Sequence, residues 1–367
     1  MRLLYIVPKI KNAGGVSRVL SVKANYFVEY FNYEVHILAQ NEVEDLPFYN
    51  FNSKVIFHNI ILNGNAFQFL KAYKKQINQK IREIDPDIIL VADNGLKAFI
   101  FPFLIKTKIP IVFEIHGSKF IEENPLKSDF ISKFISKIKY RFKDFGVRKF
   151  TKIVALSEEN LEEWDVKNGI VIPNPSWIKT EKLSTLKNKK VIAIARFSFE
   201  KGLIRLLLIW REIYKKHPDW ILEIYTDQSV ALNTIVSDFS LTEVVSVCPF
   251  VKNIEEKYLE ASIYAMTSRS EGFPMVLIEA MALGLPCIAF DCPTGPRAII
   301  KNNTNGFLIP ERDDLLFVEK LSALIENEEL RITFGENAKQ TSENYSAEKI
   351  MEQWKHFFEN LTEVKND

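Results

Sequence analysis

The amino-acid sequence predicts an α/β protein built from two Rossmann-like, doubly wound domains that face each other across a cleft. Two observations support this fold class. Short apolar runs alternate with amphipathic stretches along the chain, which is typical of a parallel sheet covered by helices. The alternation stops near residue 178 and starts again near residue 190, and 367 residues are enough for two domains with separate cores.

The first domain is predicted over residues 1–178. Its apolar runs are short and rich in Ile, Val, Leu and Phe, as expected for strands that are buried on both faces of a parallel sheet. The predicted strands are 2–7, 34–39, 54–57, 88–92, 109–115, 151–156 and 169–172. In such sheets, ligands bind at the carboxyl ends of the strands.

The second domain is predicted over residues 190–345, after a Lys- and Thr-rich linker at 179–189. The final segment, 346–367, has apolar residues at helical spacing and is expected to form a helix that packs back on the first domain. The predicted strands of the second domain are 190–195, 220–225, 244–248, 262–267, 286–290 and 306–309.

Composition excludes several classes of protein. The net charge of +1 gives no overall attraction to nucleic acid, although the first half has a basic and the second half an acidic surplus. The three cysteines are too few for a disulfide framework or a zinc site, which suggests a reducing, cytoplasmic compartment. No apolar run approaches the ~18 residues of a transmembrane helix.

Two features of the first domain lie where ligands are expected. Gly14 and Gly15 follow the first strand and precede a helical pattern, so the backbone could approach an anion at the helix start. An ordinary strand-to-helix turn explains the glycines equally well. His116, two residues after Glu114, follows the strand 109–115 and is placed to face the cleft, with a structural role in the turn as the alternative.

The first strand of the second domain ends in "ARFSFEKG", which places two cations before a helix. Arg196 can contact a diphosphate through two hydrogen bonds and Lys201 as a point charge, next to a helix N-terminus. The alternative is a solvated basic loop. No cluster of His, Asp and Glu has metal-ligand spacing, and the "DPD" at 85–87 precedes its strand, so no metal site is predicted.

The stretch "EGFPMVLIEAMALGLP" contains two glutamates around a short apolar helix that begins at Pro274. Glu271 precedes this helix and Glu279 lies within it, where an unpaired carboxylate would cost several kcal/mol. The pair is suited to holding two parts of one long polar ligand, with backbone N–H groups between them. A structural salt bridge is the alternative.

Residues 127–152 form a basic amphipathic segment. It carries nine Lys or Arg residues, among them Lys133, Lys137 and Arg141, against two Asp residues, with Phe and Ile at helical spacing. This composition is typical of a helix that lies on an anionic membrane surface, so peripheral contact with the inner face of the cell membrane is predicted. A helix packed on the core with a solvated basic face is an equal alternative.

Taken together, these motifs resemble the retaining, GT-B-fold glycosyltransferases of family 4 (glycosyl transferases group 1). The resemblance covers nearly the whole chain. It is strongest in "SEGFPMVLIEAMALGLPCIAFDC", and "GGVSR", "EIHG", "ARFSFEKG" and "NGFLIP" occur in the family order. It implies a nucleotide-sugar donor, usually UDP-linked, and front-face transfer in which the leaving phosphate accepts the acceptor's proton, without metal or further cofactor.

The resemblance also implies roles for individual residues. Arg196 and Lys201 hold the diphosphate, which Gly15 approaches from the first domain; Glu279 binds the ribose, and the base contacts the backbone near Val251.

For the reacting sugar, the resemblance implies that Glu271 holds the donor sugar and that His116 lies beside it. The residues that complete the predicted sugar site are Gly272, Phe273, Met275 and Val276.

The predicted function is transfer of a hexose or N-acetylhexosamine to a lipid-linked glycan in bacterial surface polysaccharide assembly. "DCPTGP" resembles enzymes that build such glycans. Two alternatives stay open at this point: a sugar phosphorylase on the same scaffold, and a non-catalytic sugar- or lipid-binding protein.

Overall fold

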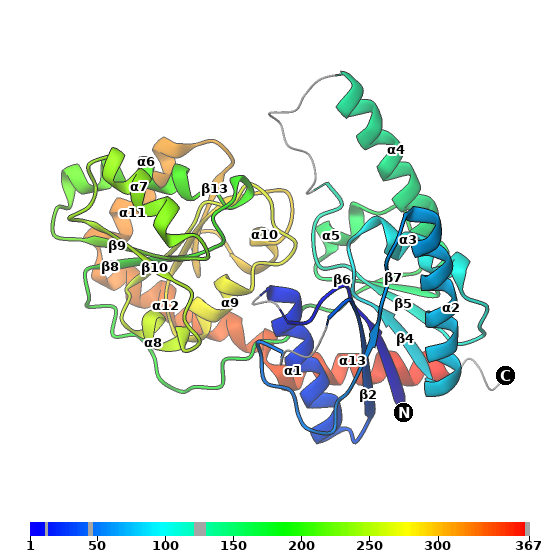
Figure 1. The fold of residues 1–367 in the computed structure, drawn as a ribbon. Helices are drawn as coiled ribbons and strands as arrows, with labels where there is room; N and C mark the ends of the chain where they lie inside the picture. Colours follow the sequence, from blue (N-terminus) through cyan, green and yellow to red (C-terminus); the bar gives the residue numbers. More distant parts are fainter. Residues whose placement is uncertain (12–13, 43–46, 121–129, 364–367) are drawn as a thin grey trace. The chain divides into compact units, whose positions relative to one another are not determined.

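The structure is a computed structural model that describes residues 1–11, 14–42, 47–120 and 130–363, with the backbone alone for 130–133. The described residues form two compact units (Figure 1). Unit 1 comprises Met1–Pro175 and the chain from Ala347 onward, and unit 2 comprises Ser176–Ser346.

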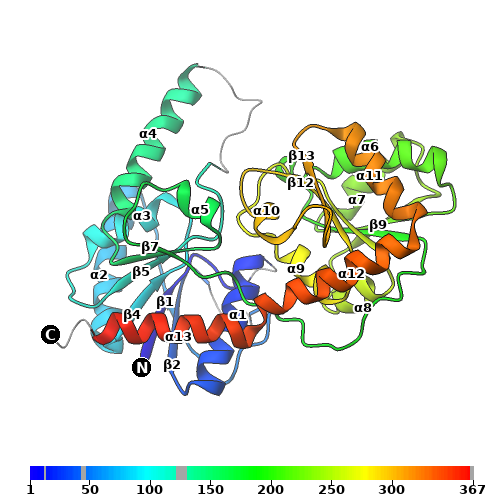
Figure 2. The same ribbon diagram turned by 180° about the vertical axis from the view of Figure 1, so that it is seen from behind.

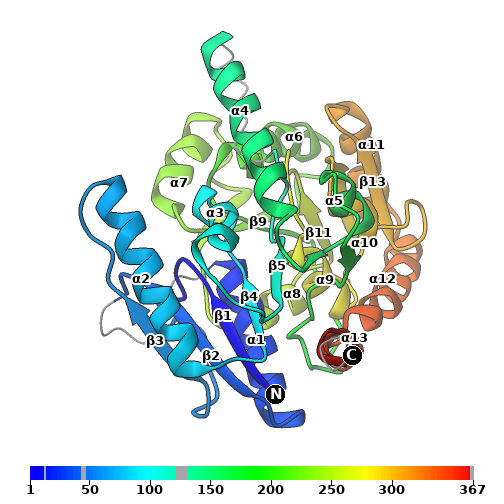
Figure 3. The ribbon, with the colours of Figure 1, turned by 90° about the vertical axis from the view of Figure 1, so that its right-hand side faces the viewer.

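Unit 1 is built on a parallel sheet with seven strands among the described residues, in the order β3-β2-β1-β4-β5-β6-β7. Figure 3 shows β1 between β2 and β4. The strands are β1 (Arg2–Ile6), β2 (Glu34–Gln40), β3 (Ile56–Ile60), β4 (Ile88–Val91), β5 (Ile111–Glu114), β6 (Lys152–Ala155) and β7 (Gly169–Val171).

Helices cover both faces of this sheet, and the alternation of side chains along each strand supplies both cores. In β1, Leu3 and Tyr5 point to the core that includes α1 and α13, whereas Leu4 and Ile6 point to the core that includes α2 and α3. The helices of unit 1 are α1 (Gly15–Tyr30), α2 (Ala66–Ile84), α3 (Leu96–Leu104), α4 (Phe130–Val147), α5 (Glu158–Glu162) and α13 (Ala347–Glu363).

The C-terminal helix α13 belongs to unit 1, although it follows unit 2 in the sequence. Its apolar face buries Ile350, Met351, Trp354 and Phe358 in the core beside α1. Figure 2 shows α13 alongside the strands of unit 1. The predicted packing of the C-terminal helix on the first domain is therefore confirmed.

Unit 2 repeats the architecture with a parallel sheet of six strands among its described residues, in the order β10-β9-β8-β11-β12-β13. Its single large core joins residues of α6, α7, α11 and α12 to the strands. The strands are β8 (Lys190–Ile194), β9 (Ile221–Thr226), β10 (Val245–Pro249), β11 (Ile263–Met266), β12 (Cys287–Asp291) and β13 (Gly306–Pro310).

Two helices of unit 2 begin at side chains that accept a hydrogen bond from a backbone N–H group of the first turn. Asp313 and Asn327 accept hydrogen bonds from the third residue after them at the starts of α11 and α12. The helices are η1 (Phe199–Lys201), α6 (Leu203–Lys216), α7 (Ser229–Asp238), α8 (Ile254–Leu259), α9 (Met275–Ala282), α10 (Pro296–Ile299), α11 (Asp314–Glu326), α12 (Glu328–Ser342) and η2 (Glu343–Tyr345).

The two doubly wound parallel sheets confirm the predicted fold class, and every predicted strand is present. Two local predictions were wrong. The strand predicted at 54–57 lies at 56–60, because Asn52 turns the chain by accepting the N–H of Val55 and Lys54. Pro274 is the residue before α9 rather than its first residue, and its backbone is extended.

The segment 179–189, predicted as a linker, lies in unit 2 and its second half packs there. Ser184 donates to the carbonyl of Ala261, and the carbonyl of Leu186 accepts from Arg331. Leu186 is buried. The unit boundaries therefore fall at residues 175/176 and 346/347. Within the described ranges, no helix is long and apolar enough to span a membrane.

Candidate functional site

The carboxyl edge of each sheet is where polar groups can gather, because helices cover both faces. In unit 2 the chain reverses its direction of strand addition between β8 and β11, and in unit 1 between β1 and β4. At such a reversal the loops that follow the two strands diverge and leave room for a ligand. Of the predicted site residues of unit 2, Arg196, Lys201 and Glu271 lie in the segments that follow β8 and β11. Glu279 lies in α9, which comes after β11, and Val251 follows β10.

Lys201 and Glu271 form an ion pair at this edge of unit 2. The Lys201 Nζ lies 2.7 Å from each carboxylate oxygen of Glu271. The side chains are 21% and 9% exposed, so the pair is largely withdrawn from solvent. Two predicted residues that lie 70 positions apart in the sequence are thus in direct contact.

Close backbone contacts hold the two loops together. Gly202 has a left-handed backbone (φ 67°), and a Cβ there would lie 2.2 Å from the carbonyl oxygen of Thr267. The Thr267 hydroxyl donates to the carbonyl of Gly202, and Arg269 donates its backbone N–H to the carbonyl of Glu200. Only glycine fits at position 202, so the backbone there can lie against Thr267, which follows β11. This contact places the neighbouring Lys201 beside the end of β11.

Arg196 follows β8 and its side chain is exposed. The carboxylate of Glu200 has a pKa below its usual value, because its own backbone N–H, Ser198 and the charges of Arg196 and Lys201 all stabilise the ionised form. Both predicted cations are therefore close enough to act on one carboxylate. They form a positively charged loop directly before α6.

Glu279 is buried in α9 and accepts a hydrogen bond from Tyr258 of α8. The Tyr258 hydroxyl lies 2.9 Å from Glu279 Oε2. Burial, followed by the charge of Glu279, raises the pKa of Tyr258. Burial, followed by the charge of Glu279, also raises the pKa of Tyr264, and the charge of Glu271 acts in the same direction. Glu279 therefore has a hydroxyl partner within unit 2, and Tyr264 lies near both glutamates.

The segment between the two glutamates is largely buried. Phe273 packs edge-on against Tyr345 with ring centroids 5.6 Å apart, while Met275 is buried and Val276 is half-buried. Gly272 contributes a carbonyl oxygen that would lie 3.2 Å from a Cβ at Gly295.

Thr294 donates its hydroxyl to the carbonyl of Glu271, so the loop after β12 fixes the backbone at Glu271. Val251 lies in the loop after β10 and is 39% exposed. Of the residues predicted in unit 2, the structure joins Lys201 to Glu271 directly, whereas Glu279 contacts a different partner.

In unit 1, Gly15 is the first residue of α1, and none of the described residues has an atom within 4 Å of the position that a Cβ would occupy there. The predicted close approach of a ligand to this backbone is thus sterically open. His116 follows β5, and its Nε2 lies 3.3 Å from Glu114 Oε2. The same Glu114 oxygen lies 2.7 Å from the Nζ of Lys23, which comes from α1.

The pKa of Glu114 reflects this pairing. Burial alone would raise it, but the Lys23 charge and the contacts with His116 hold the pKa of Glu114 at about 2. Burial lowers the pKa of Lys23, against the attraction of Glu114. The site therefore contains a buried ion pair next to His116.

Sequence reasoning missed Lys23 and Tyr258. Lys23 had a detectable signal, since it is a lone charge on the helix face that Leu20, Ala24 and Phe27 bury. Tyr258 had none, because a tyrosine in a short helix is compatible with many environments.

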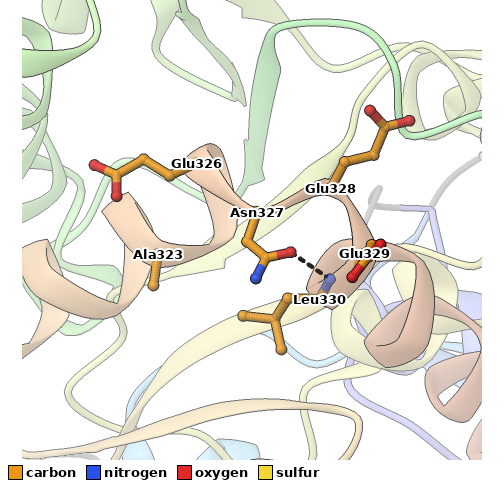
Figure 4. A pocket seen from close by; sticks show the side chains of 6 residues that line it. All are labelled: Ala323, Glu326, Asn327, Glu328, Glu329 and Leu330. Carbon is orange, nitrogen blue, oxygen red and sulfur yellow. Dashed lines mark hydrogen bonds between the residues drawn. The ribbon is translucent and has the colours of Figure 1, made fainter.

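A recess lies away from these residues in unit 2, at the junction of α11 and α12 (Figure 4). It has a volume of about 460 Å³ and is lined by Ala323, Glu326, Asn327, Glu328, Glu329 and Leu330. Glu326 lies near His217, which precedes β9, so the recess is at the amino edge of the sheet. Three glutamates would repel a phosphate, and the recess is not the predicted donor site.

Comparisons with known proteins identify the family of the chain. Residues 176–341 match the family model described as glycosyl transferases group 1, and residues 13–175 match the model described as glycosyltransferase family 4. Together the two models cover both units and include every predicted site residue.

Several known proteins are similar over nearly their whole length. The amylovoran biosynthesis glycosyltransferase AmsD of Erwinia amylovora is 29% identical over 369 residues, covering 96% of this chain and 98% of AmsD. A Campylobacter jejuni enzyme named GalNAc-alpha-(1->4)-GalNAc-alpha-(1->3)-diNAcBac-PP-undecaprenol alpha-1,4-N-acetyl-D-galactosaminyltransferase is 24% identical, covering 100% and 99%. A crystal structure of an S. aureus TarM mutant with fondaparinux, alpha-GlcNAc-glycerol and UDP has a TM-score of 0.79, 16% identity and coverage of 97% and 99%.

The buried Glu114 predicts a pH dependence of stability. Its folded pKa of about 2 lies below the ordinary value of 4.5, so its stabilisation is complete above pH 4.5 and is lost as the pH falls towards 2. The loss amounts to at most about 3 kcal/mol. In urea unfolding at several pH values, Glu114→Gln should be destabilised most near neutral pH, with the difference from wild type shrinking in acid. A pH-independent difference, like that expected for the exposed control Glu162→Gln, would contradict the prediction.

Proposed function

Because the chain belongs to the GT-B-fold glycosyltransferases, with a group 1 domain after a family 4 domain, we propose that it moves a hexose or N-acetylhexosamine from a UDP-sugar to a lipid-linked glycan. The transfer retains the configuration of the sugar and needs no metal or further cofactor. The proposed transfer is a step in the assembly of a bacterial surface polysaccharide.

The observation that carries this proposal is the Lys201–Glu271 ion pair at the carboxyl edge of unit 2. An ammonium group has three N–H donors, and the two 2.7 Å contacts with Glu271 leave one for a phosphate oxygen. Glu271 in turn keeps acceptor capacity for sugar hydroxyls. One pair can therefore contact both the diphosphate and the sugar of a nucleotide-sugar.

The cations near β8 supply the electrostatic part of the reaction. Negative charge builds on the diphosphate as the bond to the sugar breaks, and Arg196, Lys201 and nearby helix N-terminal N–H groups stabilise that charge. The leaving phosphate oxygen takes the proton of the attacking hydroxyl. No additional base is then needed.

Glu279 is proposed to bind the ribose. A buried carboxylate keeps its charge only if hydrogen-bond donors surround it, and Tyr258 supplies one of them. Ribose hydroxyls are further donors of the required kind. Val251, exposed after β10, is proposed to offer its backbone to the base, while Gly15 and His116 serve the diphosphate and the reacting sugar.

The names of similar proteins support the donor and acceptor classes. The TarM structure was determined with UDP, the AmsD enzyme is named for amylovoran biosynthesis, and the Campylobacter enzyme is named for an undecaprenol-diphosphate-linked substrate. These names favour a UDP-sugar donor and a lipid-linked glycan acceptor for this chain.

Helix α4 is proposed to contact the membrane that holds such an acceptor. Phe134, Ile135 and Ile138 are 58%, 48% and 52% exposed, next to the exposed cations Lys137 and Arg141. Residues 127–129 and the side chain at position 133 lie outside the described residues. Exposed apolar groups flanked by cations match an anionic lipid surface, where the ring and aliphatic groups enter the interface.

The other end of α4 is anchored to unit 1. Gly146 lies against the backbone of Phe99 in α3, and Lys119 forms a 2.6 Å ion pair with Asp144. The helix extends away from the sheet of its unit (Figure 1). The C-terminal part of α4 therefore packs on unit 1, while the exposed half of the helix is in contact with solvent.

The proposed reaction is tested by screening nucleotide-sugars for transfer or slow hydrolysis, with and without EDTA and inorganic phosphate. We expect release of UDP from one UDP-sugar, undiminished by EDTA and independent of phosphate. Turnover that requires phosphate would identify a phosphorylase, and donor binding without any turnover would identify a binding protein. Loss of activity in EDTA would contradict metal independence.

Substitution of the two glutamates should change different kinetic constants. Glu279→Gln removes a charged hydrogen-bond acceptor from the ribose, which should raise the donor KM by about tenfold or more. Glu271→Gln should mainly lower kcat, by about 100-fold, since the sugar loses its fixed position. Steady-state kinetics with the exposed Glu243→Gln as control measure both effects. Identical effects on KM and kcat in the two variants would contradict the division of roles.

Membrane contact through α4 predicts a selective loss of vesicle binding. Phe134→Glu with Ile138→Glu should abolish sedimentation with anionic phospholipid vesicles, because both charges would have to enter the interface. Turnover with a short soluble acceptor should be unchanged. Val230→Glu, at an apolar residue of unit 2 that is 81% exposed, is the control. Vesicle binding that survives the double substitution would contradict the proposal.

A further inference from the structure

A buried charged cluster lies behind His116 in unit 1. Lys23 of α1 and Glu114 of β5 have side chains that are 1% and 4% exposed, and their charged atoms are 2.7 Å apart. The Lys23 Nζ also lies 3.6 Å from the centre of the Trp354 ring of α13. Helices α1 and α13 pack on each other, so the cluster joins the N-terminal and C-terminal helices of the unit (Figure 2).

A gain in fold stability is a weak explanation for the presence of a buried ion pair in this cluster. A buried ion pair pays a desolvation cost that its own attraction often fails to exceed, and apolar residues of similar volume are commonly as stable or more so. The surrounding helix face is apolar, with Leu20, Ala24 and Phe27 all buried. A leucine or methionine at position 23 would continue that face.

His116 lies beside the Lys23–Glu114 pair. Its side chain is 5% exposed, and its Nε2 faces the oxygen of Glu114 that also contacts Lys23. An ionised carboxylate can only accept a hydrogen bond, so a neutral imidazole in contact with it carries its proton on Nε2 and a lone pair on Nδ1. Lys23 thereby sets the tautomer of His116 through Glu114.

The remaining ring nitrogen has no partner within the described part of the chain. His116 Nδ1 and Glu114 Oε1 are both buried there without a hydrogen bond. A buried polar atom without a hydrogen bond is destabilising and calls for an explanation. A ligand hydroxyl that donates to Nδ1 would satisfy it.

The backbone after His116 is fixed independently of the ring. Glu163 accepts hydrogen bonds from the Ser118 hydroxyl at 2.6 Å and from the Lys119 backbone N–H at 2.8 Å. With the loop held in this way, Glu114 is the neighbour that decides how the imidazole is oriented and where its proton lies.

We propose that Lys23 and Glu114 are positioning residues that hold His116 as the Nε2–H tautomer, with Nδ1 ready to accept a hydrogen bond from a sugar hydroxyl. Trp354 contributes by confining the ammonium against Glu114. The inference rests on the proposed function for the identity of the hydroxyl, which belongs to the transferred sugar or its acceptor. The tautomer itself is a property of the chain alone.

The test is imidazole ¹⁵N NMR of the full chain, in which His116→Asn identifies the signals of His116 among the five histidines. At neutral pH the wild type should show a protonated Nε2 and an unprotonated Nδ1. Lys23→Met removes the cation that keeps Glu114 ionised, and a protonated Glu114 can donate a hydrogen bond to the His116 ring as well as accept one. The amide of Glu114→Gln can do the same. Lys23→Met and Glu114→Gln should therefore shift both nitrogens towards a mixture of tautomers, whereas Lys23→Arg should restore the wild-type pattern.

Kinetics supply the second readout. In Lys23→Met, kcat should fall by about ten- to a hundredfold because the imidazole is no longer oriented, while the donor KM changes little. Lys71→Met, at an exposed lysine of α2, is the matched control. If Lys23→Met does not fold, Glu114→Gln, which keeps the size of the side chain, carries the test.

The outcomes separate this proposal from the proposed function. An Nδ1–H tautomer in the wild type, or signals of His116 that neither substitution alters, would overturn the positioning role even if transfer activity is present. The expected tautomer and its loss in the variants would support the role even if no nucleotide-sugar is turned over, in which case the proposed function fails alone.

Discussion

Parallel strand pairing is the constraint on which the rest of the structure depends. In both sheets each strand lies parallel to its neighbours, so connecting helices must return over both faces and bury them. Polar groups then collect at the carboxyl edges, where the chain leaves each strand. Lys201, Glu271 and His116 all lie in or next to such loops.

Three glutamates near these edges have partners within their own unit. Glu271 is held by the ammonium of Lys201, Glu279 by the hydroxyl of Tyr258, and Glu114 by the buried Lys23. The first arrangement is partly exposed and leaves donors and acceptors for a ligand. The other two are buried, so they fix geometry around the edge and are sensitive to the loss of one partner.

Family membership and site geometry contribute different parts of the functional conclusion. The matches to both family models establish a glycosyltransferase, whereas they say nothing about how individual side chains are paired. The geometry shows that Lys201 and Glu271 are paired at the carboxyl edge of unit 2. In unit 1, the geometry shows that Phe134, Ile135 and Ile138 of α4 are exposed beside cations.

The sequence by itself determined the elements and the motif residues, because both depend on local patterns. Apolar runs located every strand to within a few residues, and the spacing of Glu271 and Glu279 around an apolar helix marked the site. Only the tertiary structure decided the partners. Glu279 pairs with a tyrosine 21 positions away, and Glu114 with a lysine 91 positions away. Such pairs follow from strand order and helix packing, which bring distant segments together and which local periodicity does not encode.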